Sequence, residues 1–493
     1  MKSSCDVLAA DVGAGSGRLL HVKYDGSRLS FGQTHRFWNG TIKAGESLYW
    51  DVLGIYHNLA EGLAKTSLEG GCAVSMGIDT WGNDFALLDR KGLMIENPHT
   101  YRDPRTEGMI AYVSRMISEK DLYLRNGIQH VRMNTLYQLV SLVKERPYVF
   151  DNAEKFLFIP DLITYFLTGE TRCEYTLATI SQLYNYGMEN WDLPLMKLLG
   201  IPERLFPPII RPGERCGTIL PSVCADLKIE SIPLIAVGAH DTASAAAAVP
   251  EPDGQSIFIS SGTWSIVGTE TAAPVINDTS FRYNYANEGG SWNNIRLNKN
   301  VMGMWIVQEC RRRFFVEGRS YSFGDLSSLA EAAGPFGSVI DPDDSRFYEP
   351  ADMPAMIRDY CRETGQLVPD TDGGIIRCAL ESLALKYRYV IEILDRLIGR
   401  SLGSINVVGG GANNHFLCQL TADCCNRRVY AGPDEATALG NALTQLTALG
   451  ELSGSREARM LVRQSFPPAR FLPRSRERWD EFYNSFLKIT GLT

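Results

Sequence analysis

The sequence predicts an α/β protein with two domains of related architecture. Short apolar runs typical of strands alternate with segments of helical spacing along the chain. A strand, a tight turn of small residues and a second strand occur near the start and again just past the middle. The length of 493 residues exceeds that of one ordinary hydrophobic core. We therefore expect a first domain at residues 1–245, a second at 246–455 and a helical tail at 456–493.

In the first half, strands are predicted at residues 6–10 and 18–24, on either side of the turn Asp11-Val12-Gly13-Ala14-Gly15-Ser16-Gly17. Further strands are predicted at 73–78 and 85–88, because both runs are apolar and are bounded by turn residues. Residues 52–65 and 107–118 have apolar residues at helical spacing.

In the second half, the apolar run 232–239 predicts a strand that leads through His240-Asp241-Thr242 into an alanine-rich helix at 243–249. Strands at 256–259 and 264–268 enclose the turn Ser260-Ser261-Gly262-Thr263. The strand at 404–408 ends in Gly409-Gly410-Gly411 and is followed by a helix.

The composition excludes several classes of protein. Lysine and arginine number 49 against 57 acidic residues, which gives a net charge of −8 and argues against a nucleic-acid binder. No apolar run approaches the roughly 20 residues of a membrane span, and the N-terminus lacks the features of a secretory signal. We expect a cytoplasmic protein. The eleven cysteines include no CxxC pair, which favours buried thiols over a zinc site or a disulfide scaffold.

The glycine-rich turn that begins at Asp11 is a candidate phosphate site. Glycines let backbone N–H groups approach phosphate oxygens, and an aspartate at the end of a strand can hold Mg²⁺. A plain glycine hairpin with a capping aspartate is the alternative. A dinucleotide site, and with it an NAD-dependent dehydrogenase, is disfavoured because a strand rather than a helix follows the glycines.

Two further turns could contact the same ligand. The turn ending at Thr263 offers hydroxyls and N–H groups to a second side of a polyphosphate. Gly409-Gly410-Gly411 would let a base or a ribose lie against bare backbone at the start of a helix. Each turn taken alone is equally consistent with a purely structural role.

Asp241 is the most informative single residue, because it stands where an apolar strand ends and a helix begins. This is the usual place of ligand sites in α/β sheets, and a carboxylate there can accept a hydroxyl proton. The alternative is helix capping by Asp241 or Thr242. We interpret His240 as a structural or substrate-binding histidine. The loop Asp79-Thr80-Trp81-Gly82-Asn83-Asp84 combines an aromatic ring with polar groups, which suits a sugar, although it could be a simple hairpin loop.

The ordered motifs DVGAGSGR, GIDTWGNDFALLD, YRDPRTEGM, NTLYQL, GAHDTASA, ISSGTWS, INVVGGGANN and AGPDEATALGN resemble the FGGY family of carbohydrate kinases. The resemblance covers about residues 6–455. It implies an actin-like ATPase fold, in which two ribonuclease-H-like domains flank a central catalytic cleft. It also implies transfer of the γ-phosphate of ATP to the 1-hydroxyl of a ketose, with L-rhamnulose as the first candidate because several motifs are those of the branch that uses it.

The same resemblance assigns roles to individual residues. Asp241 would be the catalytic base, and Asp11 would help to hold Mg²⁺, directly or through water. ATP would contact Ala14, Gly15, Ser16, Gly17, Arg18, Thr263, Gln308 and Gly410. The ketose would contact Gly82, His240, Thr242 and Asn300.

Some alternatives stay open at this point. Another ketose, such as L-fuculose or L-xylulose, would fit the same motifs, and an actin-like ATPase module without sugar phosphorylation would share the nucleotide turns. The partners are expected to be small molecules, with no nucleic acid and no membrane, for a monomer or a homodimer. Cys361 and Cys378 stand where relatives also have cysteines, but a disulfide is not expected in a reducing cytosol.

Overall fold

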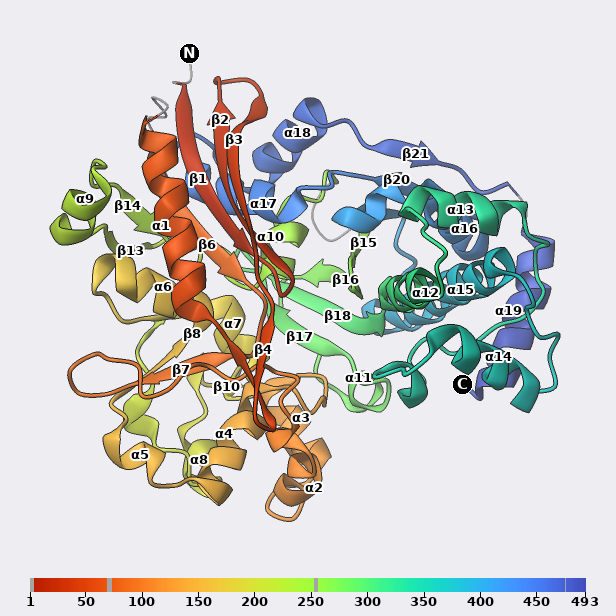
Figure 1. Ribbon diagram of the computed structural model, residues 1–493, viewed down its shortest axis with the longest axis horizontal. Helices are drawn as coiled ribbons and strands as arrows, with labels where there is room; N and C mark the ends of the chain where they lie inside the picture. The colour runs from red at the N-terminus through yellow and green to blue at the C-terminus, as the bar shows by residue number, and fades with distance from the viewer. Residues whose placement is uncertain (1–3, 69–72, 252–255, 475) are drawn as a thin grey trace. The chain divides into compact units, whose positions relative to one another are not determined.

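A computed structural model describes residues 4–68, 73–251, 256–474 and 476–493 (Figure 1). The chain divides into two compact units. Unit 1 comprises Met1–Ala248, Glu270–Leu297 and Ala436–Ser465, and unit 2 comprises Val249–Thr269, Asn298–Glu435 and Phe466–Thr493. Each unit is described by itself below. The domain limits drawn from the sequence stay predictions.

The main sheet of unit 1 has the strand order β13-β14-β6-β1-β2-β3. These strands span, in that order, Arg215–Thr218, Pro233–Ile235, Ala73–Thr80, Cys5–Val12, Ser16–Tyr24 and Leu29–Trp38. β1 pairs antiparallel with β2 and parallel with β6, and β2 pairs antiparallel with β3. The strands predicted at 6–10, 18–24 and 73–78 are therefore confirmed.

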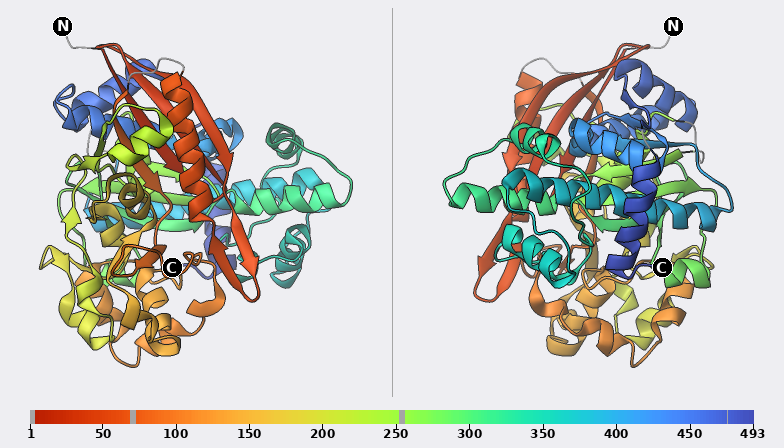
Figure 2. Two further views of the ribbon diagram at one scale, coloured as in Figure 1. Left: turned by 60° about the vertical axis from the view of Figure 1, so that its left-hand side comes forward. Right: turned by 90° about the vertical axis from the view of Figure 1, so that its right-hand side faces the viewer.

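Helix α1 (Val52–Leu68) packs against β2 and β3, and Figure 2 shows it lying along these strands. Its buried residues include Ile55, Leu59 and Leu63, which recur at helical spacing and join the apolar side chains of the sheet in one core. The predicted helix at 52–65 is confirmed. This core carries the carboxyl ends of β1 and β6, where Asp11 and Asp79 stand.

The remaining strands of unit 1 are short. They are β4 (Thr41–Ala44) with β5 (Ser47–Trp50), β7 (Phe85–Leu88) with β8 (Lys155–Phe158), β9 (Cys173–Glu174) with β12 (Ile209–Ile210), β10 (Tyr184–Asn185) with β11 (Asn190–Trp191), and β17 (Ala286–Gly289). The helices are α2 (Met109–Val113), α3 (Glu119–Asn126), α4 (Thr135–Glu145), α5 (Val149–Asn152), α6 (Ile159–Thr168), α7 (Tyr175–Ile180), α8 (Leu193–Leu198), α9 (Pro221–Leu227), α10 (Asp241–Ala247), α11 (Asp278–Arg282), α17 (Ala436–Ala448) and α18 (Ser455–Ser465), with 3-10 turns η1 (Pro104–Thr106) and η2 (Glu203–Leu205).

Helix α17 comes late in the chain but is built into unit 1, where it packs on α10 and β1. The Gln445 amide donates 2.9 Å to the carbonyl of Leu8, and its oxygen accepts from Ser75 at 2.7 Å. A Cβ atom at Gly440 would lie 1.7 Å from the carbonyl oxygen of Ser244, so only glycine allows this approach of α17 to α10. The helix therefore fixes both the sheet and the helix that follows His240.

The second large sheet has seven strands in the order β17-β18-β16-β15-β19-β20-β21, and the strands from β18 to β21 lie wholly or mostly in unit 2. From β18 to β21 these strands span Ile295–Met302, Trp264–Thr271, Ser256–Ser261, Ser404–Val408, Arg428–Ala431 and Ala469–Phe471. The last residues of β16 and the first of β18 are assigned to unit 1. β15 pairs antiparallel with β16 and parallel with β19. This repeats the β1–β2–β6 arrangement of unit 1, so the internal echo in the sequence corresponds to a repeated hairpin.

The helices of unit 2 are α12 (Trp305–Val316), α13 (Phe323–Ala332), α14 (Met353–Glu363), α15 (Asp372–Ile398), α16 (His415–Cys425) and α19 (Glu477–Thr490), with 3-10 turns η3 (Ser345–Phe347) and η4 (Gly410–Asn413). α15 has 27 residues and contacts α13 and α16. Its N-terminus is capped by the Thr371 hydroxyl, and it ends at Gly399 with φ of +75°.

Two sequence predictions were wrong in extent. The helix predicted over 107–118 is reduced to α2, because Gly108 adopts φ of +73° and starts a new short helix. The strand predicted over 232–239 ends at Ile235, since the following backbone leaves the sheet. Further on, Thr80 N donates a hydrogen bond to the carbonyl oxygen of Ala239. Among the described residues, none of the helices is long and apolar enough to cross a membrane.

Candidate active site

The turn between β1 and β2 is held by hydrogen bonds and close packing at its ends and is exposed in its middle. Gly13 N donates 2.9 Å to Ser16 O, and the side-chain amide of Asn39 donates 2.8 Å to Gly13 O. A Cβ atom at Gly17 would lie 2.1 Å from the Phe37 ring, whereas nothing lies within 4 Å of the corresponding position at Gly15. The turn is therefore held at its ends, while Gly15 and Ser16 in its middle are exposed.

Asp11 and Arg18 face each other at the root of this turn, because the β1–β2 register places them opposite one another. Arg18 Nε and Nη2 both donate to Asp11 Oδ2, at 3.0 and 2.7 Å. Asp11 is also the register partner of Asp79 on the parallel strand β6. Two carboxylates therefore leave neighbouring strands at the same edge of the sheet.

Asp241 adds a third carboxyl group to this edge. Burial, and then the charge of Asp11, raises the pKa of Asp241 to about 6. Burial and Asp11 also raise the pKa of Asp79 well above its ordinary value, while the Asn441 amide donates to Asp79 Oδ2 at 2.6 Å. Such crowding of acidic groups favours the binding of a cation at this edge.

The first turn of α10 settles the capping alternative. His240 is the N-cap residue by its backbone angles, and no side chain caps this helix end. The Asp241 side chain is 33% exposed, and its Oδ1 accepts a hydrogen bond of 3.0 Å from the Thr242 hydroxyl. Neither Asp241 nor Thr242 is the N-cap, so the carboxylate is not used for capping.

Gly82 and His240 lie close together beside Asp241. A Cβ atom at Gly82 would stand 3.5 Å from His240 Nε2 and only 2.3 Å from Ile180 Cδ1. His240 Nε2 lies 3.6 Å from Asp241 Oδ1. Unit 1 thus brings together the predicted ketose contacts Gly82, His240 and Thr242 with the predicted base.

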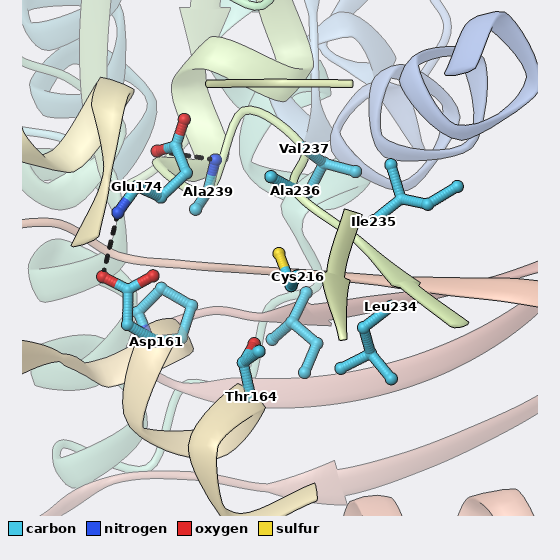
Figure 3. Close-up of a pocket in the computed structure, with 11 residues that line it drawn as sticks. Asp161, Thr164, Glu174, Cys216, Leu234, Ile235, Ala236, Val237 and Ala239 are labelled. Atoms are coloured by element: carbon cyan, nitrogen blue, oxygen red, sulfur yellow. Dashed lines mark hydrogen bonds between the residues drawn. The ribbon is translucent and has the colours of Figure 1, made fainter. Parts of the chain in front are cut away.

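The backbone before His240 is held by a buried carboxylate that the sequence did not indicate. Glu174 Oε2 accepts hydrogen bonds from Ala239 N at 3.3 Å and from the Thr176 hydroxyl at 2.5 Å, and Thr176 Oγ1 accepts from His240 N at 3.0 Å. Figure 3 shows Glu174 between Ala239 and Asp161, at a cavity of about 10 Å³. Burial raises the pKa of Glu174 to about 7. The neighbouring residues Thr171-Arg172-Cys173 and Tyr175-Thr176 gave no sequence signal of this role.

The predicted sugar loop is organised by Asp84, which is itself buried. The indole N–H groups of Trp50 and Trp81 donate to Asp84 Oδ2 at 2.6 and 2.9 Å, and the Gln138 amide donates to Oδ1 at 2.9 Å. The two indole rings lie 4.0 Å apart between centroids. Asp84 thus orients the aromatic rings instead of offering a free carboxylate.

The other predicted contacts lie in unit 2. The Thr263 hydroxyl donates 3.3 Å to Gln308 Oε1, which brings these two residues together. A Cβ atom at Gly411 would lie 2.0 Å from Ser261 Oγ, so the glycine turn packs directly on β15, while Gly410 has no neighbour within 4 Å of its Cβ position. Asn300 lies on β18 and is partly exposed.

Cys361 and Cys378 are both buried free thiols. A hydrogen bond between them lowers the pKa of Cys361 and raises that of Cys378. The two thiols are therefore neighbours without a disulfide. Cys72 lies outside the described residues.

Comparison with known proteins identifies the class. Residues 7–248 match the N-terminal domain and residues 257–449 the C-terminal domain of the FGGY family of carbohydrate kinases. The chain belongs to this family, as its motifs predicted, and a family of kinases implies ATP as the co-substrate.

Individual relatives narrow the comparison. The chain is 40% identical over 478 residues to a protein named rhamnulokinase from Bacteroides thetaiotaomicron, covering 97% of this chain and 98% of that one. It is 41% identical over 463 residues to a rhamnulokinase from Enterococcus faecalis, covering 93% and 92%.

Solved structures show the fold. The xylulose kinase from Rhodospirillum rubrum is similar with a TM-score of 0.80 at 17% identity, over 98% of each chain. The glycerol kinase from Plasmodium falciparum is similar with a TM-score of 0.79 at 16% identity, over 100% of this chain and 99% of that one. The predicted α/β fold of the actin-like ATPase class is confirmed.

Proposed function

We propose that this protein is an ATP-dependent kinase of L-rhamnulose that forms L-rhamnulose 1-phosphate and ADP. The observation that carries the proposal is the similarity, over nearly the whole chain, to proteins named rhamnulokinase. The arrangement at the edge of the unit 1 sheet supports it. The partly exposed carboxylate of Asp241 lies next to His240, and Gly82 brings no side chain to the space beside the histidine ring.

Asp241 is the proposed general base. With a pKa of about 6, its carboxyl group is ionised at neutral pH and remains basic enough to take the proton of the ketose 1-hydroxyl. The hydroxyl oxygen then attacks the γ-phosphorus in line, and the bond from that phosphorus to the bridging oxygen of ADP breaks. Most of the catalysis comes from alignment and charge stabilisation, because the phosphoryl group is metaphosphate-like in the transition state.

The ketose is proposed to contact Gly82, His240, Thr242 and Asn300. The phosphates of ATP are proposed to contact the turn Ala14-Gly15-Ser16-Gly17-Arg18 and Thr263. Gly410 is proposed to line the adenosine pocket, and Gln308 is proposed to face the nucleotide. The exposed middle of the β1–β2 turn supports this assignment, since Gly15 and Ser16 are exposed and nothing lies within 4 Å of the Cβ position of Gly15.

Mg²⁺ fits the acidic edge of unit 1. Asp11 is the proposed protein ligand, directly or through water, and the raised pKa values of Asp79 and Asp241 indicate that the site favours added positive charge. Mg²⁺ is usually held by one or two carboxylates, substrate phosphates and water. When bound, the ion neutralises phosphate charge.

The test is ADP release, coupled to a dehydrogenase assay, with Mg-ATP and a panel of L-rhamnulose, L-fuculose and L-xylulose against a blank without sugar. We expect a signal with L-rhamnulose well above the others. A larger signal with another ketose would keep the reaction and overturn the substrate. Equal ADP release with and without sugar would favour an actin-like ATPase module instead.

We also infer a cytoplasmic protein that acts on small molecules as a monomer or a homodimer. Light scattering coupled to size-exclusion chromatography would measure the mass in solution. A larger assembly would contradict this inference without affecting the proposed reaction.

A further inference from the structure

A buried ion pair stands against the ring of the proposed substrate-binding histidine. Arg296 on β18 and Glu288 on β17 are both buried, and Arg296 Nη2 lies 2.9 Å from Glu288 Oε2. The same Nη2 lies 3.2 Å from His240 Nδ1. Arg296 Nε also donates 3.1 Å to the carbonyl of Gly289, which fixes the guanidinium in place. All of these residues belong to unit 1.

The contact decides which ring nitrogen of His240 carries the proton. A guanidinium can only donate hydrogen bonds, so His240 Nδ1 must accept with its lone pair. In a neutral imidazole the proton then resides on Nε2. Burial, and then the charge of Arg296, holds the pKa of His240 well below its ordinary value, which keeps the ring neutral.

The charged groups around the ring agree with this state. Glu288 Oε2 lies 3.6 Å from His240 Nδ1, but its charge is matched by Arg296. On the other side of the ring, His240 Nε2 lies 3.6 Å from Asp241 Oδ1, which is longer than a hydrogen bond. The Nε2–H group is therefore not hydrogen-bonded to this carboxylate. The ring therefore presents a hydrogen-bond donor beside Asp241 and Gly82.

We propose that Arg296 is a positioning residue that holds His240 as the neutral tautomer protonated on Nε2, so that the ring donates a hydrogen bond to an oxygen of the ketose. This inference rests on the proposed function for the identity of the acceptor. Arg296 itself touches the ring and not the substrate. Glu288 balances the buried guanidinium charge, which would otherwise be unpaired.

Removal of Arg296 should reverse the tautomer. In Arg296→Met, Glu288 is left as the nearest group to Nδ1, and a carboxylate can only accept. The ring proton then moves to Nδ1, and the lone pair of Nε2 faces both Asp241 and the ketose. The unpaired charge of Glu288 also raises the pKa of His240.

The first experiment measures the kinetic constants for the ketose and for ATP independently. For Arg296→Met we expect kcat/KM for the ketose to fall about 10- to 100-fold, as for a lost hydrogen bond in a buried site, with the KM for ATP within about two-fold of wild type. A second ionisation, that of His240, should appear on the acid limb of the pH profile. The matched control is Arg459→Met, which removes another buried arginine of unit 1 that pairs with Glu270. The control should show no second ionisation.

The double variant Arg296→Met with Glu288→Gln tests the direction of the hydrogen bond. An amide at position 288 can donate to Nδ1 in place of the guanidinium, so ketose kcat/KM should partly recover relative to Arg296→Met. A purely structural role for the ion pair also predicts recovery, because the double variant leaves no unpaired buried charge. The comparison is therefore with Arg296→Met plus Glu288→Met, which removes the charge but supplies no donor to Nδ1. Equal recovery in both double variants would overturn the proposal.

The tautomer itself is observable by ¹⁵N NMR of protein labelled at the histidine rings. The signal of His240 is assigned as the one that is missing in the spectrum of His240→Gln. Wild type should show an Nε2 that bears a proton, and Arg296→Met should show the reverse. An unchanged ring in Arg296→Met would overturn the proposal even if activity fell. If wild type phosphorylates no ketose, the proposed function fails, but the NMR result still decides the tautomer.

Discussion

Replacement of Asp241 by asparagine is the most direct test of the proposed base, because it preserves shape while it removes the proton acceptor. General-base catalysis contributes about 10²- to 10⁴-fold to a rate. We expect turnover of the Asp241→Asn variant to fall by at least about 100-fold with saturating ketose and Mg-ATP. The side chain is one-third exposed and its Oδ1 accepts from Thr242, and an amide oxygen can accept the same bond.

The same substitution should leave the fold intact or more stable. The folded protein raises the pKa of Asp241 from 3.8 to about 6, which means that folding disfavours its charge. At neutral pH this corresponds to at most about 3 kcal/mol, and to less once solvent screening of a partly exposed group is considered. The neutral asparagine escapes this penalty. The Tm of Asp241→Asn should therefore equal or exceed that of wild type.

The assay is ADP release with each ketose of the panel, alongside thermal unfolding of both proteins. Isothermal titration with the ketose separates binding from turnover, and we expect the dissociation constant of the variant to stay within about ten-fold of wild type. Turnover close to wild type in a folded variant would refute the assignment of Asp241 as the base. Loss of activity together with a large fall in Tm would mean that the carboxylate has a structural role.

The remaining predictions concern pH and the two substrate sites. Because the pKa of Asp241 is raised to about 6 and the base acts in its ionised form, kcat/KM for the ketose should fall below about pH 6, and a pH profile that stays flat to pH 5 would contradict this. Gly82→Ala places a methyl group 2.3 Å from Ile180 Cδ1 and beside His240, so the ketose KM should rise at least about ten-fold. Gly337→Ala, where nothing lies within 4 Å, is the control that should leave both KM values unchanged. Asn39→Ala removes the bond to Gly13 O and should raise the KM for ATP about 5- to 30-fold without changing that for the ketose. Steady-state kinetics with each substrate varied in turn decides these last two predictions.

Local patterns in the sequence predicted the repeated hairpins well. The glycine turns between β1 and β2 and between β15 and β16 interrupt alternating apolar runs, and such short-range signals need no tertiary information. The helix expected over 107–118 failed for a local reason as well, since the left-handed Gly108 interrupts it. The predicted strand extended beyond the observed end of β14, because the apolar residues that follow Ile235 are buried in a loop and not in a strand.

The supporting residues of the site could not be predicted, because their partners are distant in sequence. Glu174 is 65 residues from Ala239, and Arg296 is 56 residues from His240. Asn441 reaches Asp79 across 362 residues of chain. Motifs identify the groups that would touch a ligand, whereas the groups that hold them depend on the packing of α17, β17 and the first residues of β18 within unit 1.

The three aspartates at the edge of the unit 1 sheet show how packing gives identical side chains different roles. Asp11 forms an ion pair with Arg18, whose Nε and Nη2 both donate to its Oδ2. Asp79 is fully buried, and burial together with the charge of Asp11 raises its pKa well above its ordinary value, which disfavours a further negative charge at this edge. Asp241 lies between these extremes, accessible and titrating near pH 6. Only this intermediate environment combines a charged form at neutral pH with appreciable basicity, and that combination is what a proton acceptor needs.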